Sequence, residues 1–108
     1  MLEGILYDTQ ERGEGWAEVR MLPGSPIYAA HFPGFPVTPG VALLQMALDL
    51  IGCPLKGASN LKFLIPVRPS ADGPCLRFNW TLSGDVASVE ILLADSGALC
   101  ARMNLELC

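Results

Sequence analysis

The segment that most constrains the fold of this chain is the apolar run PGVALLQMALDLI, residues 39–51. Thr38 and Pro39 predict a helix start here, because a hydroxyl can cap a helix and proline fits its first turn. Gly52 and Pro54 predict the helix end. A helix that is apolar on all sides is expected to be buried on all sides. It is shorter than the roughly 20 residues that span a bilayer, so the rest of the chain must wrap it.

The segments that could wrap this helix read as strands separated by turn-forming residues. In GWAEVRMLP, Trp16, Glu18 and Arg20 alternate with Ala17, Val19 and Met21, the period-two pattern of a half-buried strand. Similar strand-like segments are residues 60–67, 75–84, 86–95 and 98–107. Between residues 23 and 40, prolines and glycines predict a long loop without regular structure. The sequence therefore predicts an α+β fold, an antiparallel sheet wrapped around one central buried helix.

Length and composition limit the class of protein. The chain has 108 residues, 51% of them hydrophobic and 17% charged, which fits one domain over residues 1–108 and excludes disorder. A net charge of −4 argues against a nucleic-acid binder, which needs a basic surface. No apolar run is long enough for a membrane span.

The N-terminus and the cysteines suggest a compartment. The first residues include acids and lack the basic start of a signal peptide, so we expect a cytoplasmic protein. Cys53, Cys75, Cys100 and Cys108 have no C-x-x-C spacing and are expected to be reduced thiols. With His31 as the single histidine and no cysteine pair, no metal site is expected.

Candidate chemistry lies in HFPGFPVTPGVALLQ, which runs from His31 to Gln45. Histidine titrates near neutral pH and can therefore act as a general base. The backbone N–H groups of Gly40 and Val41 would lie at the positive end of the helix, where they could polarise a carbonyl. Gln45, the first polar side chain inside the helix, is an amide and has no proton to give in this pH range.

The stretch HFPGFPVTPGVALLQMALDL resembles the signature of the β-hydroxyacyl-ACP dehydratases, which have the hotdog fold, and FLIPVRPSAD resembles a later strand of that family. The resemblance implies a homodimer, or an assembly of such dimers, with pockets at the subunit interface. It implies that His31 is the base, that the Gly40 amide binds the thioester carbonyl, and that the helix of the other subunit contributes an acid. The residues expected to border the substrate are Phe32, Gly34 and Val41. The substrate would be a 3-hydroxyacyl thioester of acyl carrier protein or coenzyme A, with no metal or organic cofactor.

The acid is where this sequence departs from the family, because Gln45 stands at the position of the usual Glu or Asp. Asp49 lies one helical turn later on the same face, where many family members carry glutamine. Asp49 is therefore a candidate surrogate acid, although one turn places it about 5.4 Å further along the helix. In a dehydratase, Gln45 would position the hydroxyl or a water.

Two other functions remain open from the sequence. A hotdog thioesterase would also need a carboxylate base, and Asp49 is the only carboxylate in the helix. A non-catalytic acyl-binding subunit could have lost the acid and could pair with an active partner. The leading prediction is a hydro-lyase that dehydrates 3-hydroxyacyl thioesters, with an activity that Gln45 could weaken.

Overall fold

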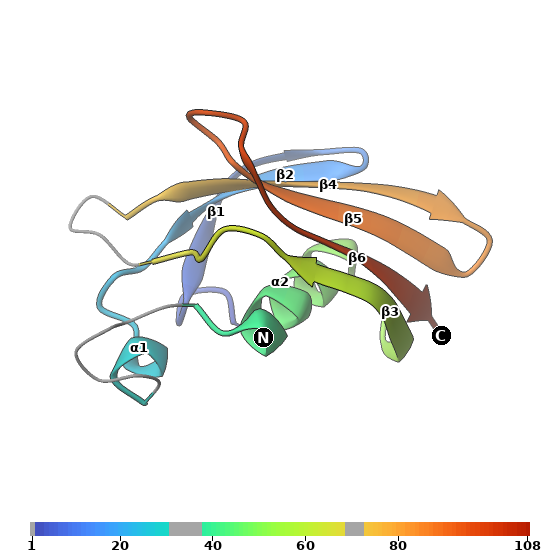
Figure 1. The fold of residues 1–108 in the computed structure, drawn as a ribbon, viewed down its shortest axis with the longest axis horizontal. Helices are drawn as coiled ribbons and strands as arrows, with labels where there is room; N and C mark the ends of the chain where they lie inside the picture. Colours follow the sequence, from blue (N-terminus) through green and yellow to red (C-terminus); the bar gives the residue numbers. More distant parts are fainter. Residues whose placement is uncertain (1, 31–37, 69–72) are drawn as a thin grey trace.

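A computed structural model describes residues 2–30, 38–68 and 73–108 and shows one antiparallel sheet with a helix across it (Figure 1). The elements are β1 (Tyr7–Gly13), β2 (Trp16–Met21), α1 (Pro26–Ala30), α2 (Gly40–Ile51), β3 (Leu55–Phe63), β4 (Cys75–Ser83), β5 (Val86–Leu93) and β6 (Leu99–Leu107). The six strands are ordered β1-β2-β4-β5-β6-β3, and every neighbouring pair is antiparallel. The predicted α+β class is confirmed.

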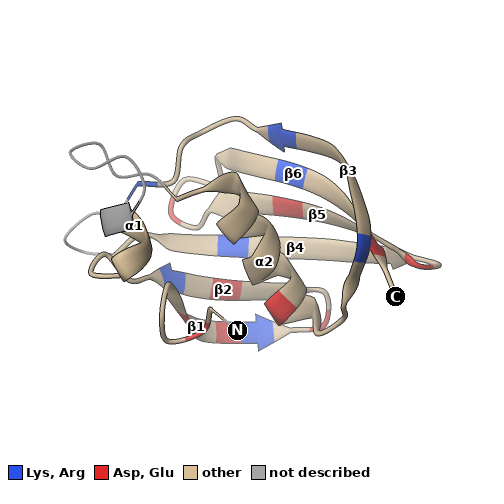
Figure 2. Cartoon of the chain, turned by 90° about the horizontal axis from the view of Figure 1, so that it is seen from below, with Lys and Arg blue, Asp and Glu red and all other residues tan. Residues whose placement is uncertain are grey.

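The core lies between α2 and the inner face of the sheet (Figure 2). On β2, Ala17, Val19 and Met21 are fully buried, as the alternation predicted. From α2, Met46 and Ala47 are fully buried against the sheet. Burial of this apolar surface is the main force that holds the helix to the strands.

The start of α2 differs from the prediction. The helix begins at Gly40, with Pro39 as its N-cap and no side-chain capping hydrogen bond. The Thr38 hydroxyl instead hydrogen-bonds to the Tyr28 hydroxyl at 2.8 Å, inside the protein. The end of α2 is as predicted: Gly52 adopts a left-handed conformation, with φ of 83°, and donates its N–H to the Leu48 carbonyl.

The prediction that α2 is buried on all sides is wrong. Val41 is 73% exposed, and Gln45 and Asp49 are half-buried. The single curved sheet covers one side of the helix, and the described part of the chain covers the other side only in part.

Three segments were missed or misplaced by the sequence pattern. Strand β3 runs over Leu55–Phe63, earlier than the predicted 60–67, and its pairing with β6 shifts register between Ser59 and Lys62. Strand β1 was not predicted. Helix α1 lies in the segment expected to be irregular; Pro26 suits its first position, and the Ser25 hydroxyl accepts a hydrogen bond from the Ile27 N–H.

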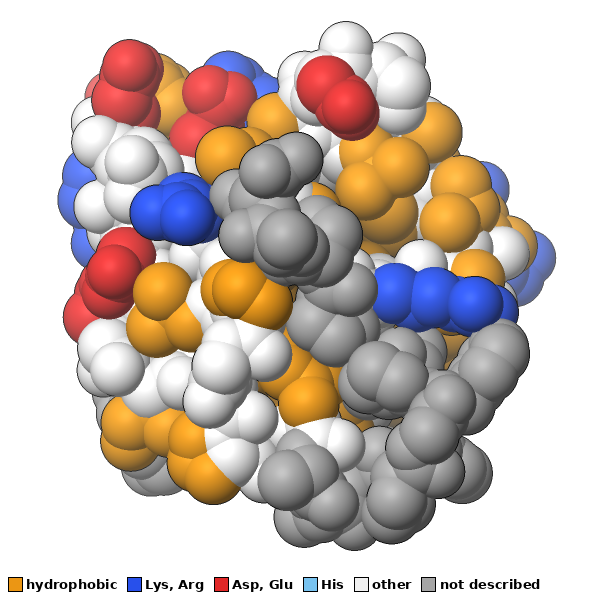
Figure 3. All heavy atoms as spheres, turned by 90° about the vertical axis from the view of Figure 1, so that its left-hand side faces the viewer, with side chains coloured by type: hydrophobic (Ala, Val, Ile, Leu, Met, Phe, Trp, Pro, Cys, Tyr) orange, Lys and Arg blue, Asp and Glu red, His pale blue; other side chains and the backbone are white. Residues whose placement is uncertain are grey.

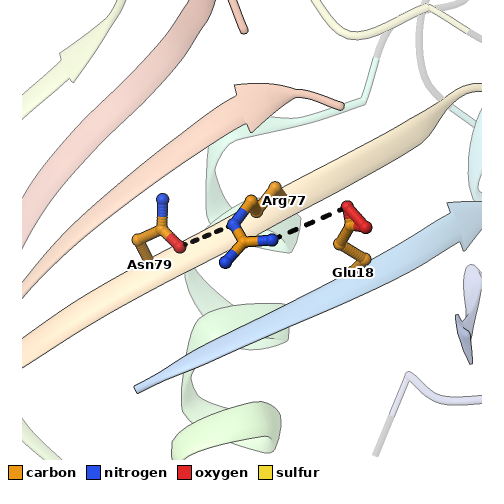
Figure 4. A network of polar contacts seen from close by, with 3 residues as sticks. All are labelled: Glu18, Arg77 and Asn79. Carbon is orange, nitrogen blue, oxygen red and sulfur yellow. Dashed lines mark hydrogen bonds and ion pairs between the residues drawn. The ribbon is translucent and has the colours of Figure 1, made fainter. Parts of the chain in front are cut away.

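The outer face of the sheet is polar. Arg77 of β4 donates to the Asn79 side chain at 3.0 Å and lies 3.9 Å from a Glu18 carboxylate oxygen on β2 (Figure 4). Its guanidinium also lies over the Trp16 ring, 4.3 Å from the centroid. These contacts link neighbouring strands, with little net stabilisation at such exposure.

Candidate functional site

His31, Phe32 and Gly34 lie outside the described residues, so the site is built here from the residues that flank them. Tyr28 of α1 precedes this segment and Thr38 follows it, and their hydroxyls are 2.8 Å apart. The Thr38 N–H donates to the Val67 carbonyl at 2.7 Å, which ties the same point to the chain after β3. Burial raises the pKa of Tyr28, against a smaller opposite effect of the Thr38 hydrogen bond, so its hydroxyl stays neutral. Tyr28 and Thr38, on either side of the segment containing His31, are therefore in contact with each other near the start of α2.

The start of α2 offers backbone donors. The N–H groups of Ala42 and Leu43 both donate to the Pro39 carbonyl, at 3.0 and 3.2 Å. Among the described residues, no backbone acceptor is found for the N–H groups of Gly40 and Val41. Such N–H groups, at the positive end of a helix dipole, stabilise an oxyanion or a polarised carbonyl.

Gln45 and Asp49 form a pair one turn apart on α2. The Gln45 amide donates from Nε2 to Asp49 Oδ1 at 2.9 Å, and the Leu2 backbone N–H donates to Asp49 Oδ2 at 2.9 Å. Both carboxylate oxygens therefore accept a hydrogen bond. Because Nε2 faces Asp49, the Gln45 carbonyl oxygen points the other way and is presented as an acceptor.

The protonation of Asp49 follows from these contacts. Partial burial by itself would raise the pKa of Asp49, but the hydrogen bonds from Leu2 and Gln45 lower it below its usual value. Asp49 is therefore ionised at neutral pH. A general acid needs the protonated form, so this environment opposes the surrogate-acid role that the sequence suggested.

Tyr7 is a buried residue that contacts Asp49. Its side chain is 1% exposed. Burial above all raises the pKa of Tyr7, and the charges of Asp49 and Glu3 and a hydrogen bond to Asp49 add to the rise, against a smaller effect of Arg12. The phenol therefore stays neutral and donates to the carboxylate. Tyr7 and Leu2 were missed by the sequence reading, because only the tertiary fold brings the N-terminal segment against α2.

The structure thus places the predicted site residues in two groups along α2. Gly40 and Val41 lie at its start, and Gln45 and Asp49 lie in its middle and last turns. With a rise of 1.5 Å per residue, Gly40 and Gln45 are about 7.5 Å apart along the axis.

Hydrophobic side chains are exposed near the start of α2. The exposed side chains at the end of β3 and just after it include Leu61, Phe63, Leu64 and Ile65, and the exposed Val41 belongs to α2. Strand β3 is an edge strand of the sheet. Figure 3 views the molecule from the left of Figure 1 and shows hydrophobic side chains in several groups on this side, with charged and polar side chains between them. An edge strand with exposed apolar side chains is typically covered by another chain.

Other features of the described residues do not add to this site. A hollow of about 710 Å³ lies on the outer face of the sheet, lined by side chains that include Asn79, Glu90 and Arg102 and by none from α2. Over residues 2–30, 38–68 and 73–108, no group of three His, Cys, Asp or Glu side chains could hold a metal ion. Neither helix of this described part has the length and apolar character that a membrane crossing requires.

Three solved structures share this architecture. The dehydratase heterocomplex ApeI:P from Xenorhabdus doucetiae aligns with a TM-score of 0.67 and 22% identity, covering 94% of both chains. An uncharacterized protein from Erwinia carotovora subsp. atroseptica aligns with a TM-score of 0.60 and 24% identity over 94% of this chain and 90% of that one. A conserved protein from Pseudomonas aeruginosa aligns with a TM-score of 0.61 and 19% identity, over 96% of this chain and 88% of that one. At sequence identities this low, the structural similarity shows that this chain shares their fold.

The family is shown by sequence. A model of the ApeI-like family, described as ApeI dehydratase, matches residues 8–91. None of the curated proteins matches the chain. The family match covers most of the 108 residues, and it confirms the hotdog dehydratase expected from the histidine motif. The protein therefore belongs to the ApeI-like dehydratase family.

Proposed function

We propose that this protein is a hydro-lyase that removes water from a 3-hydroxyacyl thioester carried by acyl carrier protein or coenzyme A, in the cytoplasm and without metal or organic cofactor. The observation that carries the proposal is the start of α2. Two N–H groups without a described backbone acceptor follow Thr38 and Pro39 directly in the chain, and Thr38 contacts Tyr28 on the other side of the segment containing His31. The family match over residues 8–91 supports dehydration as the reaction class.

The proposed reaction begins at the carbon next to the thioester carbonyl. His31 takes a proton from C2, and the N–H groups of Gly40 and Val41 stabilise the negative charge that develops on the carbonyl oxygen. The electron pair forms the C2–C3 double bond as the C3–O bond breaks. Phe32, Gly34 and Val41 border the substrate.

The departing hydroxyl is held by Gln45 in this proposal. Its carbonyl oxygen, directed away from Asp49, accepts a hydrogen bond from the C3 hydroxyl. One proton must join the hydroxyl to release water. Two side chains of the proposal can supply it: His31, which carries the proton taken from C2, or Asp49 through a water. The lowered pKa of Asp49 favours His31.

The proposed assembly is a homodimer paired along β3, or a larger assembly of such dimers. Strand β3 is an edge strand that carries the exposed Leu61. Pairing with a second copy would cover this side chain and place the Gln45 of one subunit opposite the His31 segment of the other.

A second candidate is a subunit that binds acyl thioesters and depends on a different hotdog chain for the acid. The environment of Asp49 favours this second candidate, because both oxygens of its carboxylate already accept hydrogen bonds from the protein. The ApeI:P structure from Xenorhabdus doucetiae is itself a heterocomplex.

Product analysis tests these functions together. The purified protein is incubated with a short and a medium 3-hydroxyacyl thioester, and enoyl thioester and free thiol are measured in the same sample. Enoyl product that is lost in His31→Ala supports the dehydratase. Free thiol alone would indicate the thioesterase that the sequence left open. Tight binding without either product would support the acyl-binding subunit.

A further inference from the structure

We propose that Phe63 is a specificity-determining residue that makes the site select thioesters without a branch at C2. This inference rests on the proposed function, because it assumes that the thioester carbonyl binds at the start of α2. It concerns a residue of edge strand β3 that lies outside the histidine motif.

The first observation is the close approach of Phe63 to Gly40. A Cβ atom built on Gly40 would lie 2.8 Å from Cζ of the Phe63 ring, with two further ring atoms at 3.0 and 3.1 Å. Gly40 does not have a positive φ, so its backbone conformation does not demand glycine. A Cβ atom at this position would therefore require the Phe63 ring to move.

The second observation is the direction of this contact. In a helix each Cα–Cβ bond tilts toward the N-terminus, so the ring that fills the Cβ position of Gly40 lies beside the first N–H groups of α2. Phe63 belongs to the face of β3 that points toward the helix, because its register partner on β6 is the buried Ala101. The ring therefore forms one wall of the place where the thioester carbonyl would bind.

The third observation is that this wall is accessible. Phe63 is 51% exposed although it packs against Gly40, and the neighbouring Val41 is 73% exposed. A ligand at the N–H groups would contact both side chains. A thioester whose carbonyl oxygen accepts from the Gly40 N–H would have C2 beside the ring, and a methyl branch on C2 would contact it.

The consequence is a discrimination by size. One methyl group in an apolar pocket changes kcat/KM by about 10- to 200-fold. We expect the wild-type protein to prefer 3-hydroxybutyryl thioester over its 2-methyl derivative by a factor in this range. The 2-methyl derivative keeps one hydrogen on C2, so it can still be dehydrated.

The test measures this preference in Phe63→Ala and Phe63→Leu. Phe63→Ala should lower the preference at least 10-fold, mainly through faster turnover of the branched substrate, with Phe63→Leu in between. Leu82→Ala, which removes a side chain that is 61% exposed at the far end of β4, is the control and should keep the wild-type preference. An unchanged preference in Phe63→Ala, at the wild-type assembly size, would overturn the proposal.

A binding measurement separates this proposal from the proposed reaction. Butyryl-coenzyme A and its 2-methyl derivative, 2-methylbutyryl-coenzyme A, have no hydroxyl to lose, so calorimetry compares their affinities without turnover. The wild type could turn over no substrate and still bind butyryl-coenzyme A more tightly than the branched thioester. If Phe63→Ala removes this difference in affinity, the proposed reaction is wrong and the role of Phe63 stands. If neither the wild type nor Phe63→Ala binds either thioester, the role of Phe63 is overturned.

Discussion

Gln45 donates its side-chain amide to the Asp49 carboxylate at 2.9 Å, one turn along α2. The other carboxylate oxygen accepts the Leu2 backbone N–H at the same distance. The carboxylate therefore fixes which way the Gln45 amide points, with Nε2 toward Asp49 and the carbonyl oxygen away from it. An amide has a donor end and an acceptor end, so this orientation decides what Gln45 can bind. In our proposal Asp49 is a positioning residue for Gln45, and its use as an acid remains a prediction from the sequence.

Asp49→Asn should destabilise the fold. The substitution removes the charge that accepts the hydrogen bonds of Leu2, Gln45 and Tyr7. Hydrogen bonds to charged groups contribute about 1.5–3 kcal/mol, and we expect a loss of about 2 kcal/mol in the free energy of unfolding, measured by urea denaturation. Asp95→Asn, in the exposed turn between β5 and β6, is the matched control and should change it little. Equal stability of the two variants would contradict the role of Asp49.

The same substitution should change the pH dependence of stability. Since the pKa of Asp49 is lowered in the folded state, the unfolded chain binds a proton more readily. The stabilisation is fully present above the unfolded pKa, near 3.9, and is lost as pH falls through the lower folded pKa. The difference between wild type and Asp49→Asn should therefore shrink below about pH 4. A difference that is constant from pH 7 to pH 3 would show that the charge is unimportant.

Gln45→Glu should create a coupled pair of carboxyl groups. The new carboxyl would face Asp49, where the amide nitrogen now lies 2.9 Å from an oxygen. Two carboxylates this close share a proton, which raises the pKa of one of them. If a missing acid limits the reaction, enoyl formation should rise by about 10²-fold.

The double exchange Gln45→Glu with Asp49→Gln serves as the control for that gain. It puts the acid and the amide in the order usual for the β-hydroxyacyl-ACP dehydratases and leaves no second carboxylate. An equal gain in both variants would assign the effect to the acid at residue 45. No gain in either would show that the proton already has a donor, as proposed for His31.

His31→Ala should abolish most of the proposed activity. Loss of a general base costs about 10²–10⁴-fold in rate. Enoyl thioester is measured by its absorbance, and His31→Gln is the companion variant because it keeps hydrogen-bonding groups but cannot titrate. A wild-type rate in both would exclude His31 as the base.

Tyr28→Phe should destabilise the fold near the His31 segment. It leaves the buried Thr38 hydroxyl without its 2.8 Å partner, and an unsatisfied buried group costs about 1–3 kcal/mol. Thermal unfolding measures the effect. Adding Thr38→Val removes the orphaned hydroxyl and should recover part of the loss, whereas additive losses would mean that the two hydroxyls do not interact.

Leu61→Lys should dissociate the proposed dimer. Leu61 is 43% exposed on edge strand β3, where a lysine would be buried unpaired in a dimer but tolerated in a monomer. Sedimentation velocity should give half the wild-type mass, and Leu82→Lys should leave the mass unchanged. An equal mass for all three proteins would place any interface elsewhere.

Much of the fold follows from local patterns. The alternation of Trp16–Met21 marks its buried face because side chains on a strand point to opposite faces. Gly52 marks the end of α2 because the terminating residue is left-handed. The bounds of β3 were less predictable, because its residues are mostly exposed and lack alternation.

The capping of α2 shows why local signals can mislead. Thr38 has the side chain of a helix cap, but the fold brings Tyr28 within 2.8 Å and the hydroxyl bonds there instead. Val41 looked like core and is exposed, because one sheet covers only one side of a helix.

The sequence by itself determined the class of fold, the family motif around His31, and the exchange of amide and carboxylate between Gln45 and Asp49, since these depend on residue type and spacing along one chain. Only the tertiary structure decided which way the Gln45 amide points, that Asp49 is held ionised, and that Phe63 fills the space beside Gly40. The Gln45 amide bonds to Asp49 within α2, but Leu2 and Tyr7 hold that carboxylate, and Phe63 comes from β3. Hydrophobic burial brings these segments into contact with α2, and a contact between separate segments cannot be predicted from the periodicity of either one.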